Sequence, residues 1–306
     1  MNPIRRLALY TTVYPGALDY LADWHRSVER QTDADFELWM ALDAVTVEDV
    51  VEAIGRHPAA SWVVAAPGDT PAQVRTNAWL ALTERCDGVV LVDADDVLHH
   101  DRMASARRGL KVAELAVCSL RLVDVTGRDL GMALGWPETA APESVLPGTN
   151  VFGLSNTAYR STLLRRCLPI PPDVEIVDWY LASRAWLTGA VVVGDPRPLM
   201  DYRQYAANTT GLLPPFGADR VLRDAQRVRT HLLRLVDTAA DEARPDRYAD
   251  LLAALAEVEA FQWRMSNDPA ALSAYVEALV AAPPPPRWWA HVAAPHARAL
   301  WSTTLD

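Results

Sequence analysis

The sequence predicts an α/β protein built around a mostly parallel, doubly wound sheet, with an α-helical C-terminal region. Short apolar runs alternate with amphipathic helical segments through the first 125 residues, and this alternation is typical of strand–helix–strand units. Beyond about residue 212, apolar residues recur at helical spacing instead. We therefore expect three parts, residues 1–125, 126–211 and 212–306, of which the first two form one domain.

The first part should contain five strands and four helices. The helix expected after Pro67-Gly68 has Asp69 or Thr70 as its N-cap and Pro71 at its first position. The first helix follows from Leu18, Leu21, Trp24 and Val28, which recur at helical spacing. The expected strands are residues 7–13, 36–43, 61–66, 88–92 and 115–123, and the expected helices are residues 18–31, 48–57, 71–85 and 101–114.

The rest of the chain is less regular until the C-terminal helices. Residues 127–150 are rich in Pro, Gly and Thr and should form a loop-rich excursion. Gly189 should end the second of two further helices. The expected helices are residues 161–167, 178–188, 221–239, 247–263 and 269–281, and the expected strands are residues 190–193 and 199–205.

Composition excludes several classes of protein. The formal net charge of -10, with no block of basic residues, argues against a nucleic-acid substrate. No stretch approaches about 18 consecutive apolar residues, so no transmembrane segment is expected. Cys86, Cys118 and Cys167 are widely spaced, which favours reduced thiols over disulfides or a zinc site. We expect a soluble cytoplasmic protein.

An apolar run at residues 89–92 ends abruptly in the carboxylates Asp93, Asp95 and Asp96. Four apolar residues in a row indicate a strand that is covered on both faces, as in a parallel sheet. Open α/β sheets bind ligands at the carboxyl ends of their strands. Clustered carboxylate oxygens suit Mg²⁺ or Mn²⁺. Thr11 and Asp43, at the ends of two earlier strands, should line the same crevice.

An ordered set of motifs resembles the family 2 glycosyltransferases, which are inverting enzymes with the GT-A fold. Each motif alone is weak, but their order and spacing make the set fairly specific over residues 7–211. The set comprises the strand at residues 7–13, the S-x-x-x-Q-T segment at 27–32, Asp43, Arg75 and Asn77, the D-A-D-D segment at 93–96, the V-D-W segment at 177–179 with Arg184, and the D-Y-R-Q-Y segment at 201–205.

The resemblance implies a sugar transfer from a nucleoside-diphosphate sugar, with a UDP-sugar favoured and a hexosyl group as the type transferred. Residues 1–125 would then be the half that binds the nucleotide sugar. Asp95 would ligate Mn²⁺ or Mg²⁺, and Asp93 would contact the ribose or the metal. Thr11, Asp43 and Arg75 would bind the rest of the donor. Whether Asp96 takes part in metal binding stays open.

Residues 126–211 would form the acceptor-binding half. Inversion needs one base to take the acceptor's proton, and the resemblance assigns this role to Asp178. Gly153, Trp179 and Arg184 would lie on the acceptor side. The acceptor hydroxyl could belong to a glycan, a lipid-linked carrier or a small molecule.

The chain also departs from the family pattern. Val177 stands where the family usually has Glu, and Tyr205 stands near the place where many members have a metal-binding His. Ala44 and Val45 replace the second acid and the Gly of the usual D-D-G-S segment. These changes leave the core mechanism possible but weaken any inference about the donor.

The same acidic strand end also resembles the first motif of haloacid-dehalogenase-type phosphohydrolases. Asp93 would then be a nucleophile, with Asp195 and Asp201 in a later metal-binding motif. That motif normally opens its domain, yet three strand–helix units precede it here. Lys111, the only lysine, also lies before any plausible second motif of that family. The glycosyltransferase interpretation is therefore favoured.

A third possibility is a non-catalytic sugar-nucleotide-binding or scaffold protein that uses its helical C-terminal region. The acids at positions 93, 95 and 178 argue against a loss of activity. Residues 212–306 lie outside the resemblance. They could close the core as a helical layer, cover the acceptor side or form a homodimer.

Overall fold

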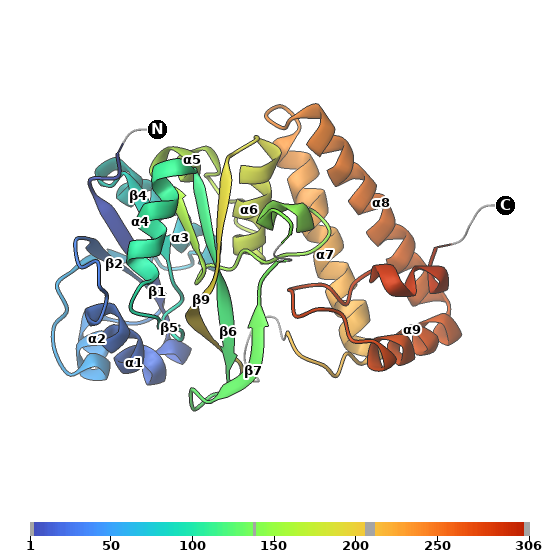
Figure 1. Ribbon diagram of the computed structural model, residues 1–306, viewed down its shortest axis with the longest axis horizontal. Coiled ribbons are helices and arrows are strands. Elements are labelled where there is room, and N and C mark those ends of the chain that lie inside the picture. The colour runs from blue at the N-terminus through green and yellow to red at the C-terminus, as the bar shows by residue number, and fades with distance from the viewer. Residues whose placement is uncertain (1–2, 137–138, 206–211, 303–306) are drawn as a thin grey trace. The chain divides into compact units, whose positions relative to one another are not determined.

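The computed structural model describes residues 3–136, 139–205 and 212–302 (Figure 1). The chain divides into two compact units. The sheet unit comprises Met1–Ser144, Phe152–Ala185 and Ala190–Tyr205, and the helical unit comprises Val145–Val151, Trp186–Gly189 and Ala206–Asp306. The end of the family resemblance, at residues 206–211, lies outside the described residues.

The sheet unit contains one mixed, mostly parallel sheet. Among the described residues it has nine strands, in the order β3-β2-β1-β4-β8-β6-β9-β5, with β7 paired to β6. The predicted α/β class with a mostly parallel sheet is confirmed. The strands are β1 Leu7–Val13, β2 Glu37–Leu42, β3 Ala60–Val64, β4 Gly88–Leu91, β5 Val97–Leu98, β6 Leu115–Val123, β7 Asp129–Leu134, β8 Thr157–Arg160 and β9 Val192–Arg203.

Strands β1 to β4 form the parallel half of the sheet. β1 lies between β2 and β4, with Tyr10 opposite both Trp39 and Leu91. All of β1 and β4 is buried, which explains their largely apolar sequences. The carboxyl ends of these strands therefore meet at one edge of the sheet.

The other half of the sheet differs from expectation in four places. One is β5, which was not expected as a strand and pairs with β9. β8 is antiparallel to both β4 and β6, and its four residues are too few to show a periodicity. β7 lies within the segment expected to be a loop. The two strands expected at 190–193 and 199–205 are one strand, β9, whose register with β6 shifts near Ser119 where Pro196 and Pro198 interrupt regular pairing.

Six α-helices in the sheet unit agree with the predicted segments within a few residues. Thr70, rather than Asp69, caps α3 in a capping box with Gln73, and Pro71 follows at the first helical position. Helices α3 and α4 lie on opposite faces of the sheet (Figure 1). The helices are α1 Leu18–Glu29, α2 Val47–Ile54, α3 Pro71–Arg85, α4 Arg102–Val112, α5 Ser161–Arg166 and α6 Val177–Leu187.

The S-x-x-x-Q-T segment holds the chain that follows the acidic strand end. The Gln31 side-chain amide donates to the carbonyls of Ser27 and His99, at 3.0 and 2.9 Å, and its oxygen accepts from Met103 N at 3.0 Å. The Ser27 hydroxyl accepts from Leu98 N at 3.1 Å. This motif therefore anchors β5 and the start of α4 to α1.

The helical unit is built from α7 Ala218–Ala239, α8 Pro245–Asn267 and α9 Pro269–Ala281, with α8 packed on both α7 and α9. His291 Nε2 donates to the buried Asp224 carboxylate at 2.8 Å. The Tyr275 hydroxyl donates to the His291 carbonyl at 2.9 Å, which ties the segment after α9 to the helices. In the described part of the chain, no helix is both long and apolar enough to cross a membrane.

Candidate active site at the carboxyl edge of the sheet

The chain continues the sheet register just past the ends of β2 and β4. Val92 N donates to the Tyr10 carbonyl at 3.0 Å, and Asp43 N donates to the Val13 carbonyl at 2.9 Å. These bonds bring Asp43 and Asp93 to the same edge as the end of β1. This is the edge at which open α/β sheets bind ligands.

Asp96 is an internal support. Its side chain is buried, and both of its carboxylate oxygens are engaged by other residues. One oxygen accepts from Arg203 N at 2.9 Å, and the other accepts from the Ser155 hydroxyl. Burial and the neighbouring carboxylates raise the pKa of Asp96 well above its usual range. These contacts hold the Asp96 carboxylate inside the protein.

Asp95 faces two phenols. The Tyr205 hydroxyl donates to its carboxylate, and the Tyr14 hydroxyl reaches the same oxygen at 3.5 Å. The Asp95 carbonyl accepts from the Arg203 guanidinium at 2.9 Å. Arg203 therefore fixes the backbone at Asp95, while the Asp95 carboxylate is turned toward the hydroxyls of Tyr205 and Tyr14.

Asp93 is the electrostatic centre of the site. Burial and the Asp95 carboxylate raise the pKa of Asp93 to about 7, Arg75 opposes the shift, and Asp178 adds to it. The Ser155 hydroxyl accepts from Asp93 N at 3.1 Å. Residues from α3, α6 and the segment after β4 therefore act on one carboxylate.

The donor-side residues expected from the sequence lie together. The pKa of the buried Tyr10 phenol is raised to about 12, mainly by burial, while Arg75 lowers it and Asp93 and Asp43 raise it. Arg75 Nε and the Thr11 hydroxyl are both buried and lack a hydrogen-bond partner within the described residues. Unpaired buried polar atoms are rare in folded proteins, so these two mark a place where a polar ligand could bind.

Asp43 does not cap the following helix. Thr46 is the N-cap of α2 and forms a capping box with Asp49, which leaves the Asp43 carboxylate outside the helix start. The next residue, Ala44, has a φ of 56°, in the left-handed region that costs a residue with a Cβ about 1 kcal/mol or more. The turn after β2 thus holds Asp43 at the crevice in a strained local conformation.

The acceptor-side residues are distributed less evenly. Asp178 is the second residue of α6 and half-buried, and its carboxylate accepts from Trp179 N at 2.8 Å. Gly153 is buried next to Asn156, whose side chain accepts from Gly153 N at 2.7 Å. Trp179 and Arg184 are buried inside the sheet unit, so neither presents an open surface to a sugar. Asp178 is the acceptor-side residue with an electrostatic link to Asp93.

The acids of the rival hydrolase motif are engaged elsewhere. Asp195 accepts from Ser105 at 2.6 Å and from Arg197 at 2.7 Å. Asp201 accepts two bonds of 2.7 Å from Arg121 and lies 2.7 Å from His99 Nε2. Both carboxylates already have cationic or hydroxyl partners, so they are poorly suited to join Asp93 around a metal ion.

The residues present fit a divalent cation that is shared with a phosphate ligand. The described residues contain no group of three or more His, Cys, Asp or Glu side chains arranged for a metal ion. Mg²⁺-type sites commonly use one or two carboxylates and complete the coordination with substrate phosphates. Asp95 and Asp93 would supply such a pair of hard oxygen ligands.

Two residues that support the acidic segment were not singled out by the sequence analysis. Ser155 bridges the acidic segment through Asp93 N and the Asp96 carboxylate, and Arg203 binds the Asp95 carbonyl and, at 2.7 Å, the Val125 carbonyl. Neither residue stands out locally, because a serine in a loop and an arginine at a strand end are common. The family resemblance of the D-Y-R-Q-Y segment at 201–205 was the available signal for Arg203.

Comparisons with known proteins identify the fold. No family model and no curated protein matches the chain. Among solved structures, TarS residues 1–349 from S. aureus in complex with UDP is similar with a TM-score of 0.54 at 16% identity, over 83% of this chain and 70% of that one.

The same TarS fragment in complex with UDP-GlcNAc matches with a TM-score of 0.54 at 13% identity, over 90% of this chain and 91% of that one. The mannosyltransferase PcManGT from Pyrobaculum calidifontis, in complex with GDP-Man and Mn²⁺, matches with a TM-score of 0.59 at 17% identity, over 92% and 76%. The fold is therefore that of the GT-A glycosyltransferases. The resemblance drawn from the motifs is confirmed at the level of the fold.

Proposed function

We propose that this protein is a metal-dependent, inverting glycosyltransferase that uses a nucleoside-diphosphate sugar, with Asp178 as general base. The observation that carries the proposal is that Asp93 and Asp95 follow β4 at the carboxyl edge of the parallel strands, and that Asp178 acts electrostatically on Asp93. Solved proteins of the same fold carry UDP, UDP-GlcNAc or GDP-Man, and PcManGT also carries Mn²⁺.

The donor would lie along the edge lined by Thr11, Asp43 and Arg75. The Thr11 hydroxyl and Arg75 Nε are polar atoms that lack a protein partner, and the Asp43 carboxylate is not used as a helix cap. Asp95 and Asp93 would hold Mn²⁺ or Mg²⁺. The cation would stabilise the negative charge that develops on the leaving diphosphate.

The transfer would be a single in-line displacement. The acceptor oxygen forms a bond to the anomeric carbon while the bond from that carbon to the diphosphate breaks. Asp178 takes the proton of the acceptor hydroxyl, and the nucleoside diphosphate leaves with the electron pair. Ser155 and Arg203 would position the acidic segment without touching the sugar.

A panel of UDP- and GDP-sugars tests the proposal by thermal shift, with Mn²⁺ and with EDTA. Specific binding to the native state raises the melting temperature by mass action. We expect one sugar nucleotide to raise it in Mn²⁺, and Asp95→Asn to lose most of this metal-dependent increase. Asp237→Asn, at an exposed site on α7, is the matched control.

Two outcomes would contradict the proposal. If no sugar nucleotide shifts the melting temperature but a phosphomonoester is hydrolysed, the phosphohydrolase interpretation is correct. If a donor binds and no acceptor from a panel of glycans, lipid-linked carriers and small molecules is glycosylated, the protein is a sugar-nucleotide-binding scaffold.

A further inference from the structure

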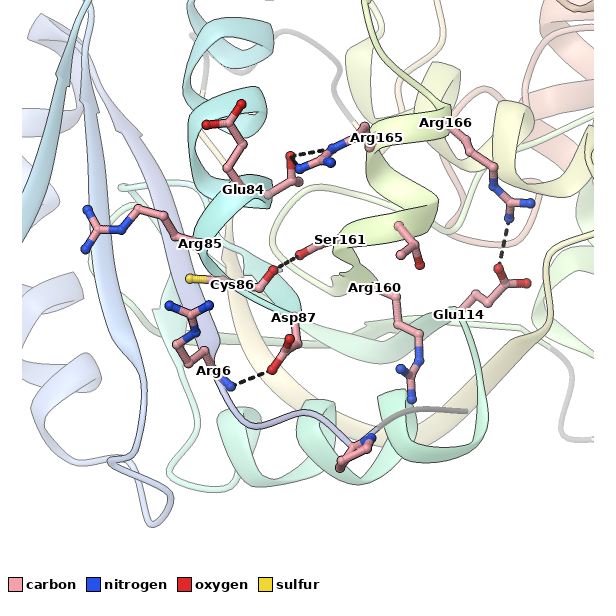
Figure 2. Close-up of a pocket in the computed structure, with 13 residues that line it drawn as sticks. Arg6, Glu84, Arg85, Cys86, Asp87, Glu114, Arg160, Ser161, Arg165 and Arg166 are labelled. Atoms are coloured by element: carbon pink, nitrogen blue, oxygen red, sulfur yellow. Dashed lines mark hydrogen bonds and ion pairs between the residues drawn. The ribbon is translucent and has the colours of Figure 1, made fainter.

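A cavity of about 720 Å³ opens in the sheet unit at the opposite end of β4 from the candidate active site (Figure 2). Asp87, directly before β4, lines this cavity, whereas Asp93 follows the other end of the strand. The volume falls within the range of small-molecule sites. Its lining includes five arginines, namely Arg6, Arg85, Arg160, Arg165 and Arg166.

The lining is positively charged although the whole chain is acidic. Three acids, Glu84, Asp87 and Glu114, share the cavity with the five arginines, which leaves an excess of two positive charges. The chain as a whole carries a formal charge of -10. The lining of this cavity therefore has the opposite sign of charge from the chain as a whole, and its positive charge attracts anions.

Two of the three acids are already used by the protein. One Asp87 oxygen accepts the backbone N–H groups of Arg5 and Arg6, each at 2.9 Å. Glu114 forms an ion pair with Arg166 at 2.8 Å. These carboxylates therefore compete little for the remaining arginines.

In the described part of the chain, three arginines of the lining have no carboxylate close to the guanidinium group. Among the described residues, Arg6 and Arg165 form no ion pair, and the nearest bonds of Arg165 go to the neutral Thr83 hydroxyl at 3.3 and 3.4 Å. Arg85 reaches a carboxylate only at 3.9 Å, on Glu37, and 60% of its side chain is exposed. Figure 2 shows Arg6 and Arg85 on the same side of the cavity.

The backbone that carries these side chains is held by hydrogen bonds. The Ser161 hydroxyl donates to the Cys86 carbonyl at 2.6 Å, and Asp87 N donates to the Arg6 carbonyl at 2.8 Å. The buried Arg160 donates to the Ala113 carbonyl at 3.3 Å. A fixed frame reduces the conformational entropy that a ligand must overcome on binding.

We propose that this cavity binds a phosphate monoester, outside the sugar-nucleotide site. Guanidinium groups bind phosphate oxygens with paired, charge-assisted hydrogen bonds. Three arginines without a close acidic partner suit a dianion better than the single charge of a carboxylate. The proposal does not depend on the transferase activity, because it concerns the other end of the strands.

Isothermal titration with phenyl phosphate tests the proposal on the full chain, in EDTA and at constant ionic strength. We expect saturable binding that is weakened about tenfold by Arg6→Gln and by Arg85→Gln, since one charged hydrogen bond contributes about 1.5 kcal/mol. Benzoate should bind more weakly than phenyl phosphate. Arg30→Gln, which removes an exposed arginine elsewhere in the sheet unit, should bind phenyl phosphate like the unaltered chain.

Three results would overturn the inference. The first is an absence of saturable binding, and the second is equal binding by Arg6→Gln, Arg85→Gln and the unaltered chain. The third is a loss of binding in Arg75→Gln alone, which would assign the phosphate to the sugar-nucleotide edge. A failure of the transferase proposal would change none of these readouts.

Discussion

The Tyr205 hydroxyl donates a hydrogen bond to the carboxylate of Asp95, the residue proposed as metal ligand. The family resemblance places a histidine near this position, so this chain offers a phenol in its place. Tyr14 approaches the same oxygen at 3.5 Å, and the two tyrosine hydroxyls lie 3.5 Å apart. Asp95 is thus oriented by two neutral hydroxyl groups, in a place where the family resemblance suggests a metal-binding histidine.

Tyr205→Phe should weaken metal-dependent donor binding. Hydrogen bonds to a ligating carboxylate orient it, and their loss typically costs roughly tenfold or more in metal affinity. Titrating Mn²⁺ at a fixed sugar-nucleotide concentration measures the change, and Tyr248→Phe on α8 serves as the control. An unchanged Mn²⁺ midpoint in Tyr205→Phe would mean that the phenol does not support the ligand.

Ser155→Ala should destabilise the sheet unit. The substitution removes a hydroxyl that makes two hydrogen bonds. This hydroxyl donates to the buried Asp96 carboxylate and accepts from Asp93 N. Leaving a buried polar group without its partner costs about 1–3 kcal/mol. Urea unfolding measures the loss, and exposed Ser144→Ala provides the comparison. Equal free energies of unfolding for the two variants would show that this bridge contributes nothing.

The sequence was sufficient to predict the parallel half of the sheet, because β1 and β4 are buried on both faces and therefore largely apolar. It was insufficient for β8, because a strand of four residues is too short to show an alternation of apolar and polar residues. β9 was divided in two because its prolines resemble a strand end, although β6 continues alongside them.

The candidate site was predictable where residue type is tied to strand position. Asp43, Asp93 and Asp95 follow strands whose ends must meet, so their proximity follows from topology. Ser155 and Arg203 reach the same segment through tertiary contacts alone, and no local pattern requires those residue types. The burial of Trp179 likewise depends on packing around α6 that its sequence does not reveal.

Asp178→Asn should abolish transfer while preserving donor binding. An amide cannot take the acceptor's proton, and loss of a general base lowers rates by roughly 10²- to 10⁴-fold. Turnover of the donor identified by thermal shift measures the first effect, and the melting-temperature shift measures the second. Asp173→Asn, in the exposed segment just before α6, is the control. Transfer at an undiminished rate would remove Asp178 from the role of base.

His231 should make the helical unit sensitive to acid. Burial within α7 lowers the pKa of His231 to about 3, whereas an unfolded histidine titrates near its usual 6.5. Below pH 6.5 the unfolded chain therefore binds a proton that the folded chain does not. The contribution of His231 to stability is complete above pH 6.5 and falls by up to about 1.4 kcal/mol per pH unit as the pH drops toward 3.

His231→Leu should accordingly flatten the dependence of unfolding free energy on pH between 6.5 and 4.5. The slope, rather than the absolute stability, is the quantity to compare, because the substitution also changes packing. His296→Leu, at an exposed site in the same unit, should retain the slope of the unaltered chain. The His231→Leu variant and the unaltered protein share every other histidine. If their unfolding free energies depend equally on pH, His231 is protonated in the folded state. The burial of its ring would then not exclude the charged form.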